Sequence, residues 1–454
     1  MKYPPYPAYK HSNTEWIGKV PKDWAVKRLK YCTSINDEAL PETTDPNFEF
    51  NYVDISSVSA TDGIVAQEKL SFENAPSRAR RIVRDGDTII STVRTYLRAI
   101  SPIRNLQGDI IVSTGFAVVR PRTVHSGFLS YALRESTFVE SIVARSVGVS
   151  YPAVNAPDVA TIPILLPPTP EQRTIADFLD VQTKKINTLI AKKRAFIEKL
   201  KEKRTALISH TVTRGLPPAA AKAAGLNHKP KLKPSGIEWL GDVPVHWAVR
   251  PLKIIVSEPI TDGPHETPEI LDDGIPFVSA ESVRNNRIDF TRKRGFISRE
   301  DHRKYSLKYS PKRDDIYMIK SGATTGNLAI VDTDDEFNIW SPLAAIRTNK
   351  KIASPRYVLH AMNAKEFQTS VQLFWSYGTQ QNIGMNVIEN LVIPLPPLIE
   401  QDAIANYLDR ETSKIDRMIK KVEAVIEKLQ EYRTALITAA VTGKIDVRKV
   451  AAKK

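Results

Sequence analysis

The sequence contains almost no cysteine and no long hydrophobic run. Cys32 is the only cysteine among 454 residues, so an internal disulfide is impossible and a reducing compartment fits. No segment approaches the roughly 18 consecutive apolar residues of a membrane-spanning helix, and the first residues lack the apolar core of a signal peptide. We therefore expect a soluble protein of the cytoplasm.

Motifs for nucleotide binding, methyl transfer and zinc binding are missing as well. The nearest approach to a phosphate-binding loop is Gly443–Lys444, but Thr438 stands where the first glycine is required. No Pro-Pro pair follows an Asp or Asn, as it would in a methyltransferase that acts on an exocyclic amine. The eight histidines form no His-x-x-x-His pair, which argues against zinc. The sequence predicts a binding protein with no catalytic residues, no metal and no cofactor of its own.

Positive charge is in excess. The chain has 65 Lys and Arg against 51 Asp and Glu, with a formal net charge of +14 and a pI near 9.5. An excess of this size favours a polyanionic partner such as nucleic acid. The hydrophobic share of 42% and the charged share of 26% are otherwise ordinary for a folded protein, and the length allows about three structural units.

Two segments of equal length carry the repeat of a helix that buries a narrow seam. In 170–214 apolar residues recur at alternating spacings of four and three, and 399–443 repeats this pattern 229 residues later. The predicted seam positions are Ile175, Leu179, Gln182, Ile186, Leu189, Lys193, Phe196, Leu200, Lys203, Leu207 and His210, and then Ile404, Leu408, Glu411, Ile415, Met418, Val422, Val425, Leu429, Tyr432, Leu436 and Ala439. Two matching seams predict an antiparallel intramolecular coiled coil. The alternatives are a homodimer zipper and a helix of an ordinary bundle.

The duplication extends beyond these helices. The segment 14–30, TEWIGKVPKDWAVKRLK, returns as IEWLGDVPVHWAVRPLK at 237–253, and a proline-punctuated strand precedes each long helix. Between these motifs each copy has the pattern of a mixed α/β (α+β) domain, with strands that follow acidic turns. The expected organisation is a first α/β domain at 1–161, a first helical region at 162–214, a linker at 215–236, a second α/β domain at 237–393 and a second helical region with a tail at 394–454.

The polar loops differ between the two copies, although the framework is repeated. Arg and Lys suit phosphates and guanine edges, and Asn and Gln suit adenine in the major groove. The candidate DNA-binding residues of the first copy are Lys69, Arg78, Arg80, Arg81, Thr92, Arg94, Tyr96, Arg98, Ser150, Tyr151 and Asn155. Those of the second copy are Arg292, Lys293, Arg294, Lys320, Ser321, Thr324, Thr325, Asn327, Tyr377, Gln380, Gln381 and Asn382. For each residue taken singly, solvated surface is the alternative interpretation.

Three duplicated motifs are specific in combination. They are W-x-G-x-V-P-x-x-W at 16–24 and 239–247, LPPTPEQRTIA and LPPLIEQDAIA before the helices, and R-T-A-L-I within them. In this order they resemble the DNA-specificity subunit of type I restriction–modification systems, over nearly the full chain. One departure is the first late loop, 146–155, which lacks the Gly-Thr-x-Gln-Asn pattern of 378–382.

The resemblance implies two target-recognition domains, each reading one half of a split DNA sequence, with paired helices that set the unread gap. It also implies that each half docks one modification (methyltransferase) subunit and that motor-nuclease restriction subunits join the complex. S-adenosylmethionine, ATP and Mg would then belong to those partners. Docking is expected on the outward face of the helices, near Leu207, Val212, Leu436 and Val441.

Two further hypotheses come from other function classes. The chain would be an enzyme if it held its own methyltransferase or nuclease site, and methylation by the isolated chain would establish that. It would be a free-standing DNA-binding regulator or a coiled-coil scaffold if no methyltransferase co-purified with it.

Overall fold

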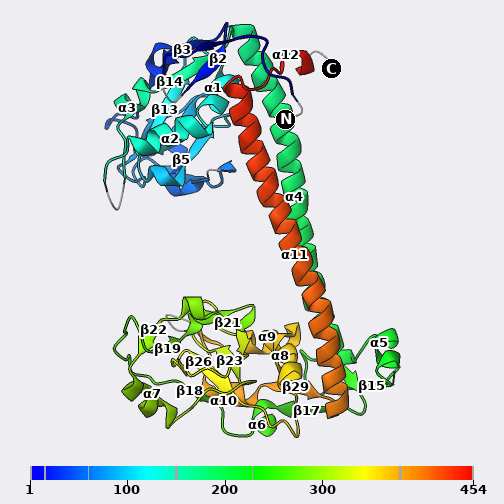
Figure 1. The fold of residues 1–454 in the computed structure, drawn as a ribbon. Helices are drawn as coiled ribbons and strands as arrows, with labels where there is room; N and C mark the ends of the chain where they lie inside the picture. The colour runs from blue at the N-terminus through cyan, green and yellow to red at the C-terminus, as the bar shows by residue number, and fades with distance from the viewer. Residues whose placement is uncertain are drawn as a thin grey trace. The chain divides into compact units, whose positions relative to one another are not determined.

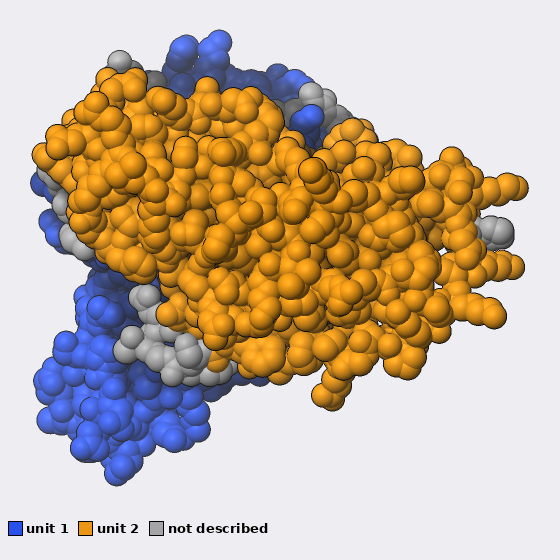
Figure 2. Space-filling model, turned by 90° about the horizontal axis from the view of Figure 1, so that it is seen from below, with its two compact units in different colours: residues 1–194, 423–454 blue, residues 195–422 orange. Residues whose placement is uncertain are grey.

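The computed structural model divides the chain into two compact units. It describes residues 3–14, 17–59, 61–148, 152–227, 229–377 and 381–451. The first unit contains Met1–Arg194 and Glu423–Lys454, and the second contains Ala195–Val422 (Figure 2). Each unit holds one α/β globule together with parts of both long helices (Figure 1). Within the described ranges, none of the helices combines the length and the hydrophobicity that a membrane span requires.

The first globule is built on two four-stranded sheets. One is antiparallel, in the order β11–β10–β13–β4, and the other has the order β8–β5–β12–β9, in which β5 and β12 are parallel. The strands are β4 (Thr33–Ile35), β5 (Glu49–Val53), β6 (Val58–Ser59), β7 (Gly63–Ile64), β8 (Glu68–Ser71), β9 (Ala79–Ile82), β10 (Thr88–Ser91), β11 (Ile100–Pro102), β12 (Ile110–Ser113) and β13 (Phe116–Pro121). Helices α1 (Ser126–Ala132), α2 (Ser136–Ala144) and α3 (Ala156–Thr161) follow. Ile89, Val112 and Phe116 belong to one core that both sheets share.

The second globule repeats this plan with a larger sheet. Six strands lie in the order β18–β26–β23–β24–β21–β20, and three more in the order β22–β19–β25. The strands are β18 (Thr261–Asp262), β19 (Ile275–Val278), β20 (Val283–Arg284), β21 (Asn286–Ile288), β22 (Gly295–Ile297), β23 (Ile316–Ile319), β24 (Leu328–Ile330), β25 (Asn338–Ile339), β26 (Leu343–Ile346) and the short pair β27 (Ser376–Tyr377) and β28 (Gln381–Asn382). The helices are α6 (Leu252–Ile255), α7 (Arg299–Ser306), α8 (Pro355–Asn363), α9 (Lys365–Leu373) and α10 (Met385–Asn390). The central pairs β10–β13 and β23–β26 have matching registers.

The duplicated opening and closing motifs pair with each other in each globule. Strand β3 (Ala25–Arg28) is antiparallel to β14 (Pro163–Leu166), and β17 (Ala248–Pro251) is antiparallel to β29 (Val392–Leu395). Hairpins precede them, formed by β1 (Tyr9–His11) with β2 (Lys19–Pro21) and by β15 (Leu232–Pro234) with β16 (Asp242–Pro244). Prolines are tolerated in these pairs because each has only two strands, so both strands are edge strands.

Buried hydrogen bonds explain the Pro-x-x-Glu-Gln residues that begin each long helix. Glu171 accepts hydrogen bonds from Tyr6 Oη at 2.5 Å and from Trp24 Nε1 at 3.2 Å. In the second unit, Glu400 contacts His246 Nε2 at 2.8 Å. The neighbouring glutamines, Gln172 and Gln401, bridge backbone groups: they accept from His125 N and Ser354 N and donate to Pro167 O and Pro396 O, all at 2.8 Å. Gln401 also donates to Ile352 O at 3.0 Å. These polar residues therefore join each helix to its globule.

The long helices are α4 (Thr169–Arg214) and α11 (Leu398–Val441), and they run antiparallel. In the first unit, Arg433 Nη1 donates to Asn187 Oδ1 at 2.6 Å. In the second unit, Arg204 Nε donates to Asp416 Oδ1 at 3.0 Å. Residue numbers rise along α4 while those of their partners fall along α11, which confirms the antiparallel coiled coil (Figure 1).

The predicted seam is correct at every second position and at Ile175, Ile404 and Ala439, and it is displaced by one residue at the other positions. Leu179, Ile186 and Leu200 are buried, as expected. Leu189 and Phe196 are 41% and 45% exposed, whereas the residues that follow them, Ile190 and Ile197, are buried. The same shift occurs in α11, where Met418, Val425 and Tyr432 are exposed and Thr412 is buried. Adjacent apolar pairs fit either order of threes and fours, so only the partner helix decides which one is covered.

Segment 215–236 contains more structure than its linker composition suggested. It holds α5 (Pro218–Ala223) and β15, and the side chains of Leu216 and Ala221 are buried in the core of the second unit. The end of the chain, with α12 (Arg448–Ala451), closes the first unit in a comparable way. Ile445 is buried there, and Asp446 N donates to Pro4 O at 2.7 Å. Both segments follow the R-T-A-L-I end of a long helix and cap the globule beside it.

Candidate nucleic-acid interface

In the first globule, the loop that follows β10 is joined to the late loop before α3. Val154 N donates to Thr92 O, and Arg94 N donates to Pro152 O, both at 2.8 Å. Val93 also forms a bridge with Ala153. These bonds hold the backbone of the two loops together and leave Arg94, Tyr96 and Arg98 exposed at the surface.

The second globule holds the equivalent loops in the same way. Gly322 N donates to Gln381 O at 3.0 Å, and Ile383 N donates to Lys320 O at 2.8 Å. Ser321 bridges Asn382, as Val93 bridges Ala153 in the first globule. We name the pair of loops 92–98 with 152–155 the first reading surface, and the pair 320–327 with 381–383 the second reading surface.

The two reading surfaces share their backbone conformation but differ in residue type. Arg94 and Arg98 lie in the left-handed region, with φ of 53° and 52°. The structurally matching residues of the second surface are glycines, Gly322 at 97° and Gly326 at 92°. A left-handed residue other than glycine costs about 1 kcal/mol. Arginine at two positions that favour glycine indicates a role for the guanidinium groups rather than for the turn.

Three arginines and a lysine of the first globule already have intrachain partners, and one of them is Arg98, which pairs with Glu140 of α2. Lys69 Nζ lies 2.6 Å from Glu49, and Arg78 Nη2 lies 2.9 Å from Asp54. The hydrogen bond from Arg78 to Tyr52 is the main cause that raises the pKa of this guanidinium. Arg80 lies over the Phe72 ring at 4.6 Å with a mostly buried side chain, and Arg81 Nε is also buried. Arg78 is the more accessible of these arginines, with 56% of its side chain exposed.

Of the second-globule candidates, Arg292 and Arg294 are exposed. Lys320 and Thr325 instead make contacts within the chain. Arg292 lies 3.7 Å from Asp289, and Arg294 covers the Trp340 ring at 4.1 Å. Lys293 lies over the Phe296 ring at 4.4 Å. Lys320 Nζ lies 3.0 Å from Asp262 and is largely buried. Despite the burial of Asp262, hydrogen bonds from Lys308 and Lys320 lower the pKa of its carboxyl.

Thr325 does not have a free hydroxyl for base reading. It is 9% exposed and its Oγ1 donates to Gly322 O at 2.7 Å, so its side chain shapes the turn. Thr92 Oγ1 likewise donates to Gly115 O at 2.9 Å. Among the remaining candidates, Asn155, Thr324, Asn327 and Asn382 are exposed, whereas Ser321 and Gln381 are partly buried. Ser150, Tyr151, Gln380 and the side chain of Tyr377 lie outside the described residues.

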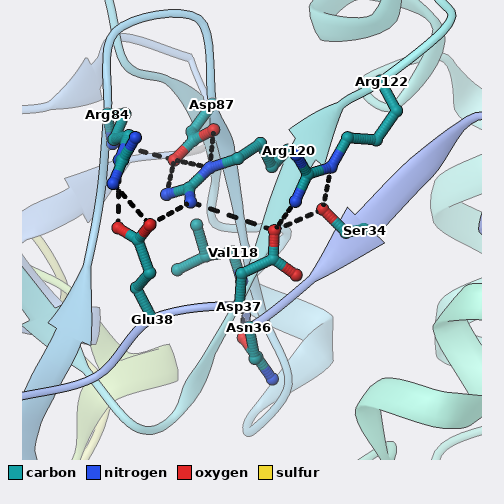
Figure 3. Close-up of polar contacts among 9 residues, drawn as sticks. All are labelled: Ser34, Asn36, Asp37, Glu38, Arg84, Asp87, Val118, Arg120 and Arg122. Atoms are coloured by element: carbon teal, nitrogen blue, oxygen red, sulfur yellow. Dashed lines mark hydrogen bonds and ion pairs between the residues drawn. The ribbon is translucent and has the colours of Figure 1, made fainter.

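A buried ion pair that the sequence analysis missed anchors the strand before each reading surface. Asp87 is 1% exposed and accepts from Arg120 Nη2 at 2.9 Å, across β10 and β13. Figure 3 shows how Asp37, Glu38, Arg84 and Arg122 extend this cluster. The hydrogen bond to Asp87 is the main cause that raises the pKa of Arg120.

The second globule has the matching ion pair. Asp315, also 1% exposed, accepts from Arg347 Nη2 at 2.6 Å. The sequence predicts turn residues before β10 and β23, which is correct for Asp314, with φ of 75°, but incomplete for Asp315. The available signal was an Asp at each of these positions together with an Arg at the end of the matching strand.

The family model for the type I restriction modification DNA specificity domain matches residues 21–199 and 263–428. The chain belongs to this family. It is 23% identical to the MjaVIII type I restriction enzyme specificity subunit of Methanocaldococcus jannaschii, over 95% of both chains. It is 25% identical to the EcoKI type I restriction enzyme specificity subunit of Escherichia coli K12, over 45% of this chain and 44% of that one.

A solved structure supports the fold. A chain from a study of complex assembly and conformational transition of the type I R-M system superposes with a TM-score of 0.65 and 24% identity, covering 93% of this chain and 98% of that one. The protein is thus a DNA-specificity subunit of a type I restriction–modification system with two α/β domains and paired long helices.

The docking residues predicted for the specificity subunit need correction. Val212, Leu436 and Val441 are 1–3% exposed and belong to intrachain cores. Leu207 is partly buried against the core of the second unit. Val212, Leu436 and Val441 hold each helix on its own unit and are not accessible to a partner in this structure, whereas Leu207 is only partly covered. Among the described residues, no group of three or more His, Cys, Asp and Glu is placed to hold a metal ion.

Proposed function

We propose that the two reading surfaces contact the two halves of a split DNA target. The observation that carries this proposal is the matched loop framework, with arginines in one copy at the left-handed positions that glycine occupies in the other. A shared loop framework with different side chains lets two domains of one plan read two different sequences.

Within this proposal, the exposed cations and polar side chains have separate tasks. Arg78, Arg292 and Lys293 contribute to phosphate contacts that are independent of sequence and weaken with salt. Arg94 and Arg98 are the candidates for guanine contacts in the major groove. Asn327 and Asn382 are the candidates for adenine contacts on the second surface.

The chemistry of the system is proposed to lie in partner subunits. Methyltransferase subunits would supply S-adenosylmethionine chemistry at adenine, and motor-nuclease subunits would supply ATP- and Mg-dependent cleavage. The chain would act in the cytoplasm as their non-catalytic DNA reader. The long helices are proposed to set the number of unread base pairs between the half-sites, because α4 and α11 connect the two globules.

The test replaces the two arginines with the residues of the other domain. In the complex assembled with the methyltransferase subunits, Arg94→Gly with Arg98→Gly should reduce methylation at the cognate target by about 10- to 100-fold, because two base contacts are lost. Sites that match only the second half should gain relative to the cognate site. Mapping methylated adenines across a genome measures both effects.

The matched control changes an arginine with no proposed base contact. Arg145→Gln, on the exposed end of α2, should leave the target sequence unchanged. If the R94G/R98G variant still recognised the same first half-site at normal strength, the first reading surface would be misassigned.

A further inference from the structure

The first unit contains a polar cavity of about 700 Å³ beside both long helices. Strand β11 and the residues after it, the end of α1 and facing residues of α4 and α11 form its walls, and all of them belong to the first unit. Four arginines line it: Arg104, Arg134, Arg194 and Arg433. Among the described lining residues, Asp62 is the one carboxylate.

Carboxylates neutralise only part of this cluster. Arg104 Nη1 lies 2.7 Å from Asp180, and Arg194 Nη1 lies 3.7 Å from Asp62. The contacts of the other two arginines are with neutral groups. Arg134 Nε donates to Ser130 O at 2.8 Å, with the guanidinium 4.8 Å from the Tyr131 ring, and Arg433 Nη1 donates to Asn187 Oδ1 at 2.6 Å.

Burial in this cavity lowers the pKa values of Arg134 and Arg433. Burial is the main cause that lowers the pKa of Arg134; Arg104 and Arg433 lower it further, whereas Tyr131 and Asp180 oppose this shift. Burial also lowers the pKa of Arg433, and Arg194 adds to that effect although Asp62 opposes it. Both side chains remain charged at neutral pH, so the cavity holds excess positive charge within a partly desolvated space.

The second unit shows that the fold does not require these cations. Tyr131 Oη donates to Asp180 at 2.6 Å, and His360 Nε2 contacts Asp409 at 2.7 Å in the same arrangement. Three residues beyond Tyr131 is Arg134, and three residues beyond His360 is Asn363. Asn363 Nδ2 donates to Leu359 O at 2.8 Å, which repeats the bond from Arg134 Nε to Ser130 O with a neutral side chain.

The other positions of the cluster are neutralised or acidic in the second unit. Arg204 pairs with Asp416 where Arg433 meets Asn187 in the first unit, so a carboxylate replaces an amide. Arg104 lies two residues beyond β11, and Asp332 lies two residues beyond the matching strand β24. A scaffold of one plan therefore carries a cluster of cations around a cavity in one unit, whereas these matching positions of the other unit are neutral, ion-paired or acidic.

We propose that this cavity of the first unit is a phosphate-binding site, with Arg134 and Arg433 as the principal ligands and Arg104 and Arg194 at its border. Guanidinium groups bind phosphate oxygens through paired, charge-assisted hydrogen bonds. The volume exceeds that of a single phosphate and suits a polyphosphate or a short stretch of phosphodiester backbone. The site is separate from the reading surfaces and does not depend on their assignment.

The experiment uses the full-length protein and inorganic tripolyphosphate, titrated by calorimetry at low salt. Saturable binding at one site per chain is expected. Asn187→Asp gives Arg433 the carboxylate that Arg204 already has in the second unit, so folding should be preserved and affinity should fall about tenfold or more. The control Asn47→Asp makes the same charge change in an exposed turn and should retain the original affinity.

A second measurement distinguishes the two sources of phosphate. Binding to a duplex without target sites is followed as salt is varied. If the site holds DNA backbone, N187D should reduce the salt slope by about one, and if it holds a free polyphosphate, the slope should not change. No saturable tripolyphosphate binding, or equal weakening by N187D and N47D at unchanged thermal stability, would overturn the proposal, and neither result would bear on the reading surfaces.

Discussion

The two α/β globules are alike where side chains are buried and unlike where they face solvent. Trp24 and Trp247 are both 1% exposed, and the Asp–Arg pair before each reading surface is in the same register. The exposed arginines at left-handed positions in one globule are glycines in the other. Burial constrains the framework residues, because each has a partner that must change with it, whereas an exposed loop side chain needs only a backbone that tolerates it.

The comparison also separates structural charge from functional charge. Each unit has one buried Asp–Arg pair, which is Asp87–Arg120 in the first unit and Asp315–Arg347 in the second. This is expected for a pair that holds two strands together. The arginine cluster of the first-unit cavity and the arginines of the first reading surface occur in one unit only. Charge that the duplicate lacks is therefore the better indicator of a binding site.

The largest effect is expected from changing the two helices unequally. Residues 198–204 and 416–422 face each other in the second unit, as the Arg204–Asp416 contact shows. Deleting both heptads keeps the seam in phase and should shorten the unread gap by about 3 base pairs while both half-sequences persist. Deleting only one should break the pairing and abolish specific methylation. Methylation mapping with the assembled complex measures both outcomes, and altered half-sequences in the double deletion would show that reading and spacing are not separable.

The second prediction compares how much each buried ion pair stabilises its own unit. Asp315→Asn and Asp87→Asn should each destabilise their own unit by about 2 kcal/mol, because an arginine of low exposure loses its buried carboxylate and keeps only more exposed ones, such as Glu258 or Glu38. The loss should be larger for Asp315, which also accepts from Tyr309 Oη at 2.5 Å. Hydrogen exchange, measured for individual peptides, gives the free energy with which each unit opens.

The neighbouring Asp314→Asn is the control for that series. Asp314 is a turn residue with φ of 75°, a conformation that asparagine tolerates. Its substitution should change stability by less than about 0.5 kcal/mol. Equal losses for D314N and D315N would contradict a specific role for the buried pair.

A smaller effect distinguishes the two buried tryptophans. Trp24 Nε1 donates to Glu171 at 3.2 Å, whereas Trp247 Nε1 has no partner in the described structure. Trp24→Phe and Trp247→Phe should lose similar packing, and the first should cost about 1 kcal/mol more because it also removes a bond to a carboxylate. Denaturant-dependent hydrogen exchange of each unit measures the difference. A larger loss for W247F would mean that packing, not the hydrogen bond, separates the two sites.

The smallest expected effect is a loss of stability of the second unit at low pH. Burial would raise the pKa of Asp409, but hydrogen bonds from His360 and Arg356 lower it overall. A carboxyl with a lowered pKa stabilises the fold fully above its ordinary value of about 3.9, and this contribution is lost as pH falls from there through the lowered value. Protection of α8 and the start of α11 should decline over that interval, and Asp409→Asn should remove the decline. A pH profile that D409N leaves unchanged would assign the acid sensitivity to another group.

The sequence predicted the elements that repetition and periodicity mark directly. Both long helices begin and end within two residues of the expected positions, and their antiparallel pairing follows from two matching seams. The alternation of threes and fours could not be decided, because Leu189 and Ile190 are both apolar and only one meets the partner helix. Docking near Leu207, Val212, Leu436 and Val441 is an expectation from the family resemblance, and three of these residues, Val212, Leu436 and Val441, pack in the cores of their own units.

The amino-acid sequence by itself determined the duplicated α/β plan, the two long helices, the positive charge and the family. Each of these depends on local pattern or on composition. Tertiary structure alone decided which charged residues are neutralised. Asp87 and Arg120, and likewise Arg134 and Arg433, are distant in the chain and become neighbours only when strands and helices pack. The free energy of a charge depends on its neighbours and on its exposure to water, and neither quantity is written in the order of residues.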